Sequence, residues 1–164
     1  MSRLRIFLAL VLICTAPCFA DEANVVQLAR SMVEAINDRD LDRLDDLVAG
    51  NVIRHSAATA GVTITNLEAF KAFLRTDFAA VPDSEISIEV IFGNKEYVAM
   101  RAMYSGIQTG AMGPFPPSGN KVELPFVGIL RVAEGKISEM WVEWDNVYML
   151  TQLGHMRSMT EIAE

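Results

Sequence analysis

The spacing of the apolar residues changes at Pro82, and this change limits the chain to a small set of folds. In three segments before Pro82, apolar side chains recur every three or four positions, as they do along one face of a helix. After Pro82 they alternate with mostly polar neighbours, which is the period of a half-buried strand. Helices followed by a run of strands are typical of an α+β domain, in which helices cover one face of a mostly antiparallel sheet.

Capping and turn residues give the approximate limits of these elements. Helices are predicted over residues 24–37, from Asp40 to Gly50, and from Asn66 to Pro82. A short strand that contains His55 precedes the third helix, and further strands are predicted over residues 86–92, 97–108, 121–132 and 136–145. Residues 147–153 can form a last helix. A long curved sheet covered by three N-terminal helices would enclose a cone-shaped pocket, with the Gly- and Pro-rich loop 109–119 at its mouth.

The first 20 residues have the features of a secretory signal peptide. Arg3 and Arg5 precede an apolar stretch, and small residues lead to Ala20, which is followed by acidic Asp21. The stretch is shorter than the roughly 20 residues of a membrane span, so an uncleaved anchor is the weaker alternative. We therefore expect a signal peptide over residues 1–20, a single domain over residues 21–164, and export to the periplasm or the medium.

Charge and composition exclude several classes of function. The chain of 164 residues has 14 basic and 21 acidic side chains, a net charge of -7, and no basic cluster suited to nucleic acid. Both cysteines lie in the predicted signal peptide, and two separated histidines give no recognised metal-ligand spacing. Phosphate-loop and dinucleotide fingerprints are absent from the sequence. We expect no metal, no cofactor, no nucleic-acid partner and no membrane span after processing.

Several short strings look familiar in their order and spacing. They lie at residues 34–37 with 40–41, 52–56, 81–83, 106–110, 113–119, 135–141, and 145 with 152–154. With these strings the sequence resembles the SnoaL-like polyketide cyclase or ester cyclase family, within the wider nuclear-transport-factor-2-like cone fold that includes ketosteroid isomerases. Membership in such a family indicates fold better than reaction. Relatives often associate through the convex sheet face, so the resemblance also implies a homo-oligomer.

The resemblance implies roles for two positions. The family's acidic proton-transfer group after its Glu-x-Trp string matches Asp145 in this sequence. The histidine of the family's Gly-Thr-His-Thr-Gly string is replaced by Gln108, and an amide can donate a hydrogen bond to an enol oxygen but cannot titrate. Asp145 at the mouth of an apolar cavity would have a raised pKa and act as a base. The structural alternative is that Asp145 caps the helix that follows it.

Further candidates for substrate contact come from residue type and strand alternation. Gln108 and Tyr104 share a strand face and can hydrogen-bond a carbonyl oxygen, or they belong to a buried structural network. His55 can orient a ligand carbonyl, although a lone histidine is more often a packed one. Trp141 and Met103 are predicted to contact an apolar ligand, with plain core packing as the alternative. His155 is interpreted as a surface residue.

These observations leave three hypotheses for function. The first is a cofactor-independent cyclase or isomerase that takes a proton from carbon beside a carbonyl, with Asp145 as the base and Gln108 with His55 or Tyr104 at the enolate oxygen. The second is a non-catalytic exported protein that binds a small apolar carbonyl compound in the same pocket. The third is a structural oligomerisation domain.

Overall fold

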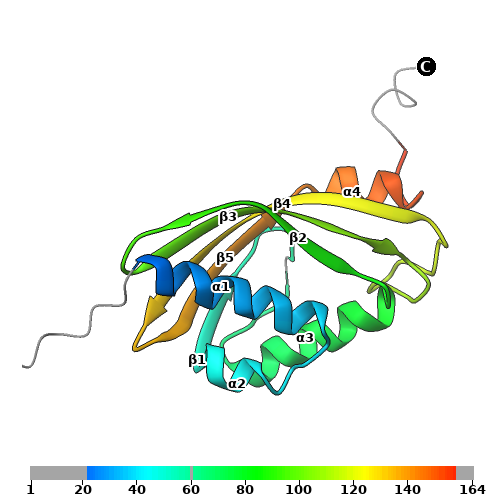
Figure 1. The fold of residues 1–164 in the computed structure, drawn as a ribbon. Coiled ribbons are helices and arrows are strands. Elements are labelled where there is room, and N and C mark those ends of the chain that lie inside the picture. Colours follow the sequence, from blue (N-terminus) through cyan, green and yellow to red (C-terminus); the bar gives the residue numbers. More distant parts are fainter. Residues whose placement is uncertain (1–21, 60, 158–164) are drawn as a thin grey trace, which may run out of the picture.

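A curved sheet of five strands carries helices on its concave side (Figure 1). The computed structural model describes residues 22–59 and 61–157. The elements in chain order are α1 (Glu22–Asn37), α2 (Leu44–Leu47), β1 (Val48–His55), α3 (Leu67–Ala80), β2 (Glu85–Gly93), β3 (Tyr97–Ile107), β4 (Lys121–Ala133), β5 (Lys136–Trp144) and α4 (Asn146–Gln152). The predicted α+β class with a curved, mostly antiparallel sheet is confirmed.

The strand order is β1-β5-β4-β3-β2, and only β1 pairs in parallel. The four strands from β2 to β5 follow one another as antiparallel neighbours, joined in two cases by short turns. Register shifts in the β1–β5, β2–β3 and β4–β5 pairs mark irregular positions, and such bulges bend a strand and increase its twist. The resulting curvature gives the sheet the concave face on which the helices pack.

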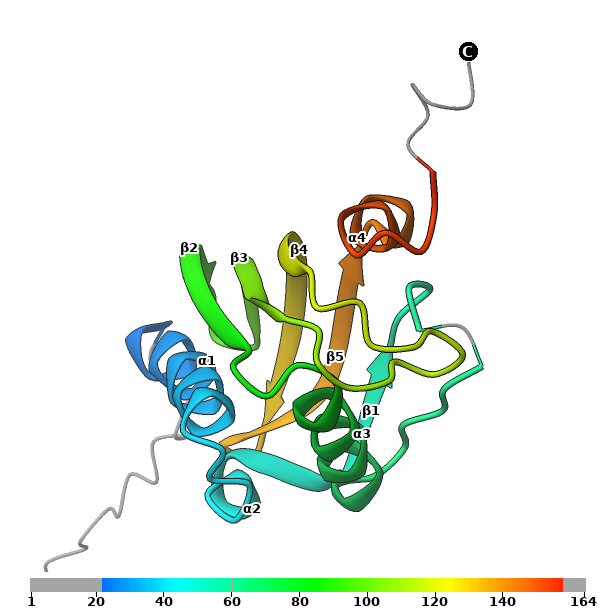
Figure 2. The same ribbon diagram turned by 90° about the vertical axis from the view of Figure 1, so that its right-hand side faces the viewer.

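Helices α1 and α3 both lie on the concave side of the sheet, and α4 lies beyond the end of β5 (Figure 2). The apolar stripe of α1 is buried, as is that of α3 at Leu67, Phe70 and Leu74. Helix α3 begins where the Asn66 side chain accepts a hydrogen bond from the backbone N–H of Ala69. The main core is therefore formed by these helices and the inward-facing side chains of β1, β3, β4 and β5.

Two predictions of local structure were wrong. The second helix is a single turn that ends at Leu47, and Gly50 lies inside β1 instead of ending a helix. The chain turns extended at Val48 because β1 pairs with β5, and Val48 is fully buried in that pairing. Strand pairing at the sheet edge has thus overridden the helical pattern predicted from Asp40 to Gly50, and a helix of that length is not stable alone.

The expected signal peptide and the expected self-association stay predictions. The signal peptide predicted over residues 1–20 lies outside the described residues. None of the helices within residues 22–59 and 61–157 has the length and apolar character needed to cross a membrane. The convex face carries exposed apolar side chains, among them Phe92, Val127 and Ile129, but self-association of the chain stays a prediction.

Candidate functional site

A cavity of about 560 Å³ lies between the concave face of the sheet and helices α1 and α3. One wall comes from the inward residues of β3, β4 and β5, such as Met100, Phe126 and Trp144, and the opposite wall from Phe73 and its neighbours on α3. Residues 112–115 of the loop after β3 and three residues of α4 also line it. Most of the surrounding side chains are apolar, and a volume of this size can hold a drug-sized organic molecule.

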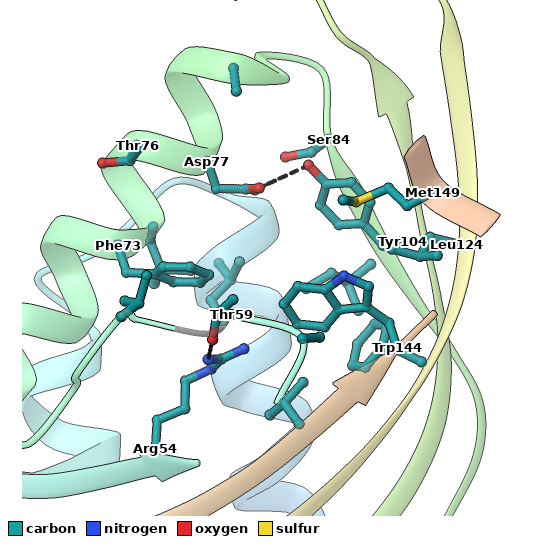
Figure 3. A pocket seen from close by; sticks show the side chains of 18 of the residues that line it. Arg54, Thr59, Phe73, Thr76, Asp77, Ser84, Tyr104, Leu124, Trp144 and Met149 are labelled. Atoms are coloured by element: carbon teal, nitrogen blue, oxygen red, sulfur yellow. Dashed lines mark hydrogen bonds between the residues drawn. The ribbon is translucent and has the colours of Figure 1, made fainter. Parts of the chain in front are cut away.

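Polar side chains gather at two separate places in this cavity (Figure 3). Asp77 and Tyr104 approach each other at one end, near Ser84. Arg54 and Thr59 lie at the other end, with the rings of Phe73 and Trp144 between the two groups. Within the described part of the chain, Asp77 is the only carboxylate that lines the cavity.

Asp77 reaches the cavity because it continues the buried stripe of α3. It follows Phe73 by four residues and Leu74 by three, so it lies on the same helix face, one turn further on. Tyr104 lies on the concave face of β3, opposite Leu124 of β4. The Tyr104 hydroxyl donates to the Asp77 carboxylate, with distances of 3.1 Å to Oδ1 and 3.2 Å to Oδ2.

The surroundings of this pair change the acidity of both groups. Burial raises the pKa of Asp77 from its ordinary value of 3.8 to about 6, although the hydrogen bond from Tyr104 and the positive charge of Arg39 act in the opposite direction. Burial, followed by the negative charge of Asp77, raises the pKa of Tyr104. Tyr104 therefore stays a hydrogen-bond donor at physiological pH, while Asp77 can gain or lose a proton near neutrality.

Arg39 holds the backbone around this end of the cavity. Its guanidinium donates to the carbonyl oxygens of Ile36, Asn37, Pro82 and Ser84, and to the Ser84 hydroxyl. These bonds tie the end of α1 to the segment between α3 and β2. Nη1 and Nη2 of Arg39 thus both donate to the protein, and the Arg39 charge acts on Asp77 from a fixed position.

The loop after β3 is anchored over the cavity by Gln108. This side chain is fully buried, and its amide nitrogen donates to the carbonyl oxygens of Gly110 and Pro116. Its Oε1 lies 2.9 Å from Nε2 of His155, so this ring nitrogen must be the donor. The interpretation of His155 as a surface residue was wrong, because the chain after α4 turns back and places its ring on Gln108 and Phe115.

A glycine allows this loop to pack closely on α3. A Cβ atom at Gly110 would collide with the backbone carbonyl of Ala79 at the end of the helix. The backbone N–H groups of Thr109 and Gly110 both donate to the carbonyl oxygen of Ala80. The loop is therefore fixed at its start, which places Met112 and Phe115 in the cavity lining.

Of the six residues proposed from the sequence, Tyr104 lies in the cavity wall. Gln108 lies in the loop anchor, without facing the cavity. Asp145 is exposed, and its Oδ1 accepts the backbone N–H of Tyr148 at 3.0 Å, so it caps α4. Its neighbours Trp144 and Asn146 both line the cavity, which puts Asp145 at the rim.

The other three residues lie on the convex face of the sheet. His55 stacks on Trp141 with ring centroids 5.3 Å apart, and its Nε2 lies 2.8 Å from Oε1 of Glu139. Met103 precedes Tyr104 and faces the opposite way. Strand alternation had left two possible inward faces on β5, and the structure places Met140, Val142 and Trp144 inward. The roles of His55, Trp141 and Met103 in binding stay predictions.

Sequence reasoning missed Asp77 and Arg54, although both carry a detectable signal. Asp77 continues the three- and four-residue spacing of an apolar helix stripe, where a solvated carboxylate is not expected. Arg54 shares strand parity with buried Val52 and so faces the core. In each case a charged residue occupies a position that the hydrophobic pattern assigns to the interior.

Comparisons with known proteins give a consistent result. A protein-family model described as SnoaL-like polyketide cyclase matches residues 26–153. The crystal structure of IdmH, a candidate polyketide cyclase from Streptomyces antibioticus, has 30% sequence identity and a TM-score of 0.70, over 78% of this chain and 96% of that one. Among proteins of curated function, none matches the sequence.

Two more distant structures share the fold. A candidate SnoaL-like polyketide cyclase from Jannaschia sp. CCS1 has 21% identity and a TM-score of 0.75, over 84% of this chain and 96% of that one. An LEH-like epoxide hydrolase from M. tuberculosis has 15% identity and a TM-score of 0.65, over 87% of this chain and 98% of that one. The same cone of sheet and helices thus carries different chemistry in different proteins.

Proposed function

The chain belongs to the SnoaL-like polyketide cyclase family, and from this premise we propose that it is a cofactor-independent enzyme that removes a proton from a carbon beside a carbonyl group. Its substrate is a small, largely apolar molecule held in the cavity under the sheet. The observation that supports this most directly is the Asp77–Tyr104 pair, which joins a carboxylate and a phenol in an apolar wall.

Asp77 has the properties of a general base for this reaction. With a pKa of about 6, it is mostly ionised at pH 7 and still basic enough to hold a proton during the reaction. An exposed aspartate near its ordinary pKa of 3.8 would be a much weaker base. The apolar walls that raise the pKa also exclude water from the carbanion that forms.

The proposed step moves one proton and one electron pair. Asp77 takes the proton from the carbon, and the electrons of that C–H bond move toward the carbonyl oxygen to form an enolate. As Asp77 becomes protonated, the Tyr104 hydroxyl shifts its hydrogen bond from the Asp77 carboxylate to this oxygen. In a cyclase the carbon then attacks a second carbonyl of the same molecule, and the new alkoxide recovers the proton from Asp77. In an isomerase Asp77 returns the proton to a different carbon.

Asp145 remains the second candidate for the base, because it occupies the position that the family resemblance assigns to proton transfer. It lies between two residues of the cavity lining, although its carboxylate also caps α4. Removing each carboxylate in turn separates the two assignments. Asp77→Asn and Asp145→Asn keep the side-chain size and an oxygen acceptor, so each removes the charge with little change of shape.

The test uses hydrogen–deuterium exchange of 2-tetralone, a bicyclic aromatic ketone with an acidic C–H beside its carbonyl. NMR in heavy water measures the exchange rate with the wild type and with Asp77→Asn, Asp145→Asn and the exposed control Asp42→Asn. We expect the wild type and the control to accelerate exchange equally, and Asp77→Asn to lose about 10²- to 10⁴-fold, which is the usual contribution of a general base.

The other outcomes are equally informative. A loss confined to Asp145→Asn would transfer the role of base to Asp145. Binding of 2-tetralone without any acceleration by the wild type would contradict the enzyme proposal and support the second hypothesis, an exported small-molecule binding protein. Tryptophan fluorescence can report that binding, because Trp144 lines the cavity.

A further inference from the structure

Arg54 places a positive charge inside the apolar cavity, at the end away from Asp77 (Figure 3). It extends from the concave face of β1 and is 8% exposed. Its guanidinium lies 4.8 Å from the centroid of the Phe73 ring and 5.7 Å from that of Trp144. The two aromatic rings hold the cation in place and favour it through their faces, but neither ring supplies a hydrogen-bond acceptor.

The guanidinium has few partners for a group with five N–H donors. Nη1 donates to the Thr59 hydroxyl at 3.0 Å. Within residues 22–59 and 61–157, no carboxylate forms an ion pair with Arg54. Arg39, the other cationic side chain in the lining, differs in this respect, because its Nη1 and Nη2 make five hydrogen bonds to the protein.

The acidic groups around the cavity do not neutralise Arg54 by contact. The charge of Glu143 acts on Arg54, but its carboxylate is exposed and already accepts the backbone N–H groups of Ala57 and Ala58. Asp77 accepts a hydrogen bond from Tyr104 and interacts electrostatically with Arg39. A buried cation without a contacting anion is unfavourable, and a ligand anion would relieve that cost.

We infer that the substrate is an organic acid whose carboxylate binds Arg54 while its apolar body spans the cavity. A planar guanidinium with free donors matches a carboxylate through two parallel hydrogen bonds. Resting on the proposed function, the inference adds that the carbonyl-bearing end of the same molecule lies at Asp77 and Tyr104. Arg54 would then set the orientation of the substrate, because the other end of the cavity carries the Asp77 carboxylate, which repels a second carboxylate.

The test compares two probes that differ in charge alone. 2-Naphthoate carries a carboxylate at pH 7, and 2-naphthamide has nearly the same shape without the charge. Calorimetric titration of the wild-type protein is expected to show about 10- to 100-fold tighter binding of the naphthoate, the range that hydrogen bonds to a charged group provide. Equal affinity for the two probes, or binding of the naphthamide alone, would overturn the inference.

Three variants test whether Arg54 causes the preference for naphthoate over naphthamide. Arg54→Met keeps an unbranched chain between the rings and should remove the preference, and Arg54→Lys should keep part of it because the charge remains. Arg75→Met, on the exposed face of α3, removes the same charge and should leave the preference unchanged. Full preference in a folded Arg54→Met protein would contradict the inference, and thermal melting verifies that each variant folds.

One further variant separates this inference from the proposed function. Asp77→Asn should keep the naphthoate preference, since Asp77 lies at the other end of the cavity, even though the proposed enzyme loses exchange activity. If the wild-type protein prefers naphthoate but does not accelerate exchange, the result would support an acid-binding cavity and contradict the proposed reaction. If the wild-type protein accelerates exchange but shows no preference for naphthoate, the result would support the proposed reaction and contradict the acid-binding cavity.

Discussion

The raised pKa of Asp77 makes the stability of the protein depend on pH in a way that one substitution should remove. Asp77 titrates at about 6 in the folded protein and at an ordinary value of 3.8 when unfolded. Between these values the folded chain binds a proton that the unfolded chain has lost, so the free energy of unfolding falls as pH rises from about 3.8 to about 6. The gap corresponds to about 3 kcal/mol, since each pKa step of one equals about 1.4 kcal/mol.

Asp77→Asn removes the charge and keeps an oxygen that can accept the Tyr104 hydroxyl. At pH 4 the wild type is largely protonated at this position, so the two proteins should have similar free energies of unfolding. Above pH 7 the wild type has an ionised carboxylate in an apolar wall, and the variant should be more stable by up to about 3 kcal/mol. Such a gain would show that the ionised Asp77 carboxylate lowers the stability of the fold, as expected of a residue kept for its function as a base.

Urea denaturation of both proteins from pH 4 to pH 8 measures this difference directly. Asp42→Asn, an exposed substitution with the same change of charge, corrects for the general effect of removing one negative charge from an acidic protein. All other ionisable groups are the same in both proteins, so their contribution cancels. A difference between wild type and Asp77→Asn that does not grow with pH would refute the assignment of a raised pKa to Asp77.

Three further outcomes are expected. Tyr104→Phe removes the hydrogen bond that lowers the pKa of Asp77, so the pH at which 2-tetralone exchange is half-maximal should rise. The maximal rate should fall about 10²-fold. An unchanged midpoint would show that Tyr104 does not act on the base. Gln108→Leu leaves two carbonyl oxygens and the His155 donor without their partner, and thermal melting should show a loss of about 2–3 kcal/mol, while the exchange rate per folded molecule tests its predicted ligand role. N-terminal sequencing of exported protein should begin at Asp21, and a chain that still begins at Met1 would contradict the signal peptide.

The sequence determined the α+β class and the limits of most elements, because helical and strand spacings are local properties of the chain. The change at Pro82, the cap at Asn66 and the turn before β5 were all readable from residue order. It also brought Tyr104 into consideration and placed the loop after β3 at the cavity. Where the local signal was short, as at Gly50, pairing between distant strands decided the outcome.

Only the tertiary structure decided which sheet face forms the cavity. Alternation divides β5 into Trp141 on one side and Trp144 on the other, and the two sides look equally suitable in the sequence. The choice depends on where α1 and α3 pack, and that is a long-range property. The same packing brings Asp77 of α3 to Tyr104 of β3, 27 residues apart, and it is burial by this packing that raises the pKa of the carboxylate. A residue's chemistry is set by its surroundings, and those surroundings come from segments far away in the chain.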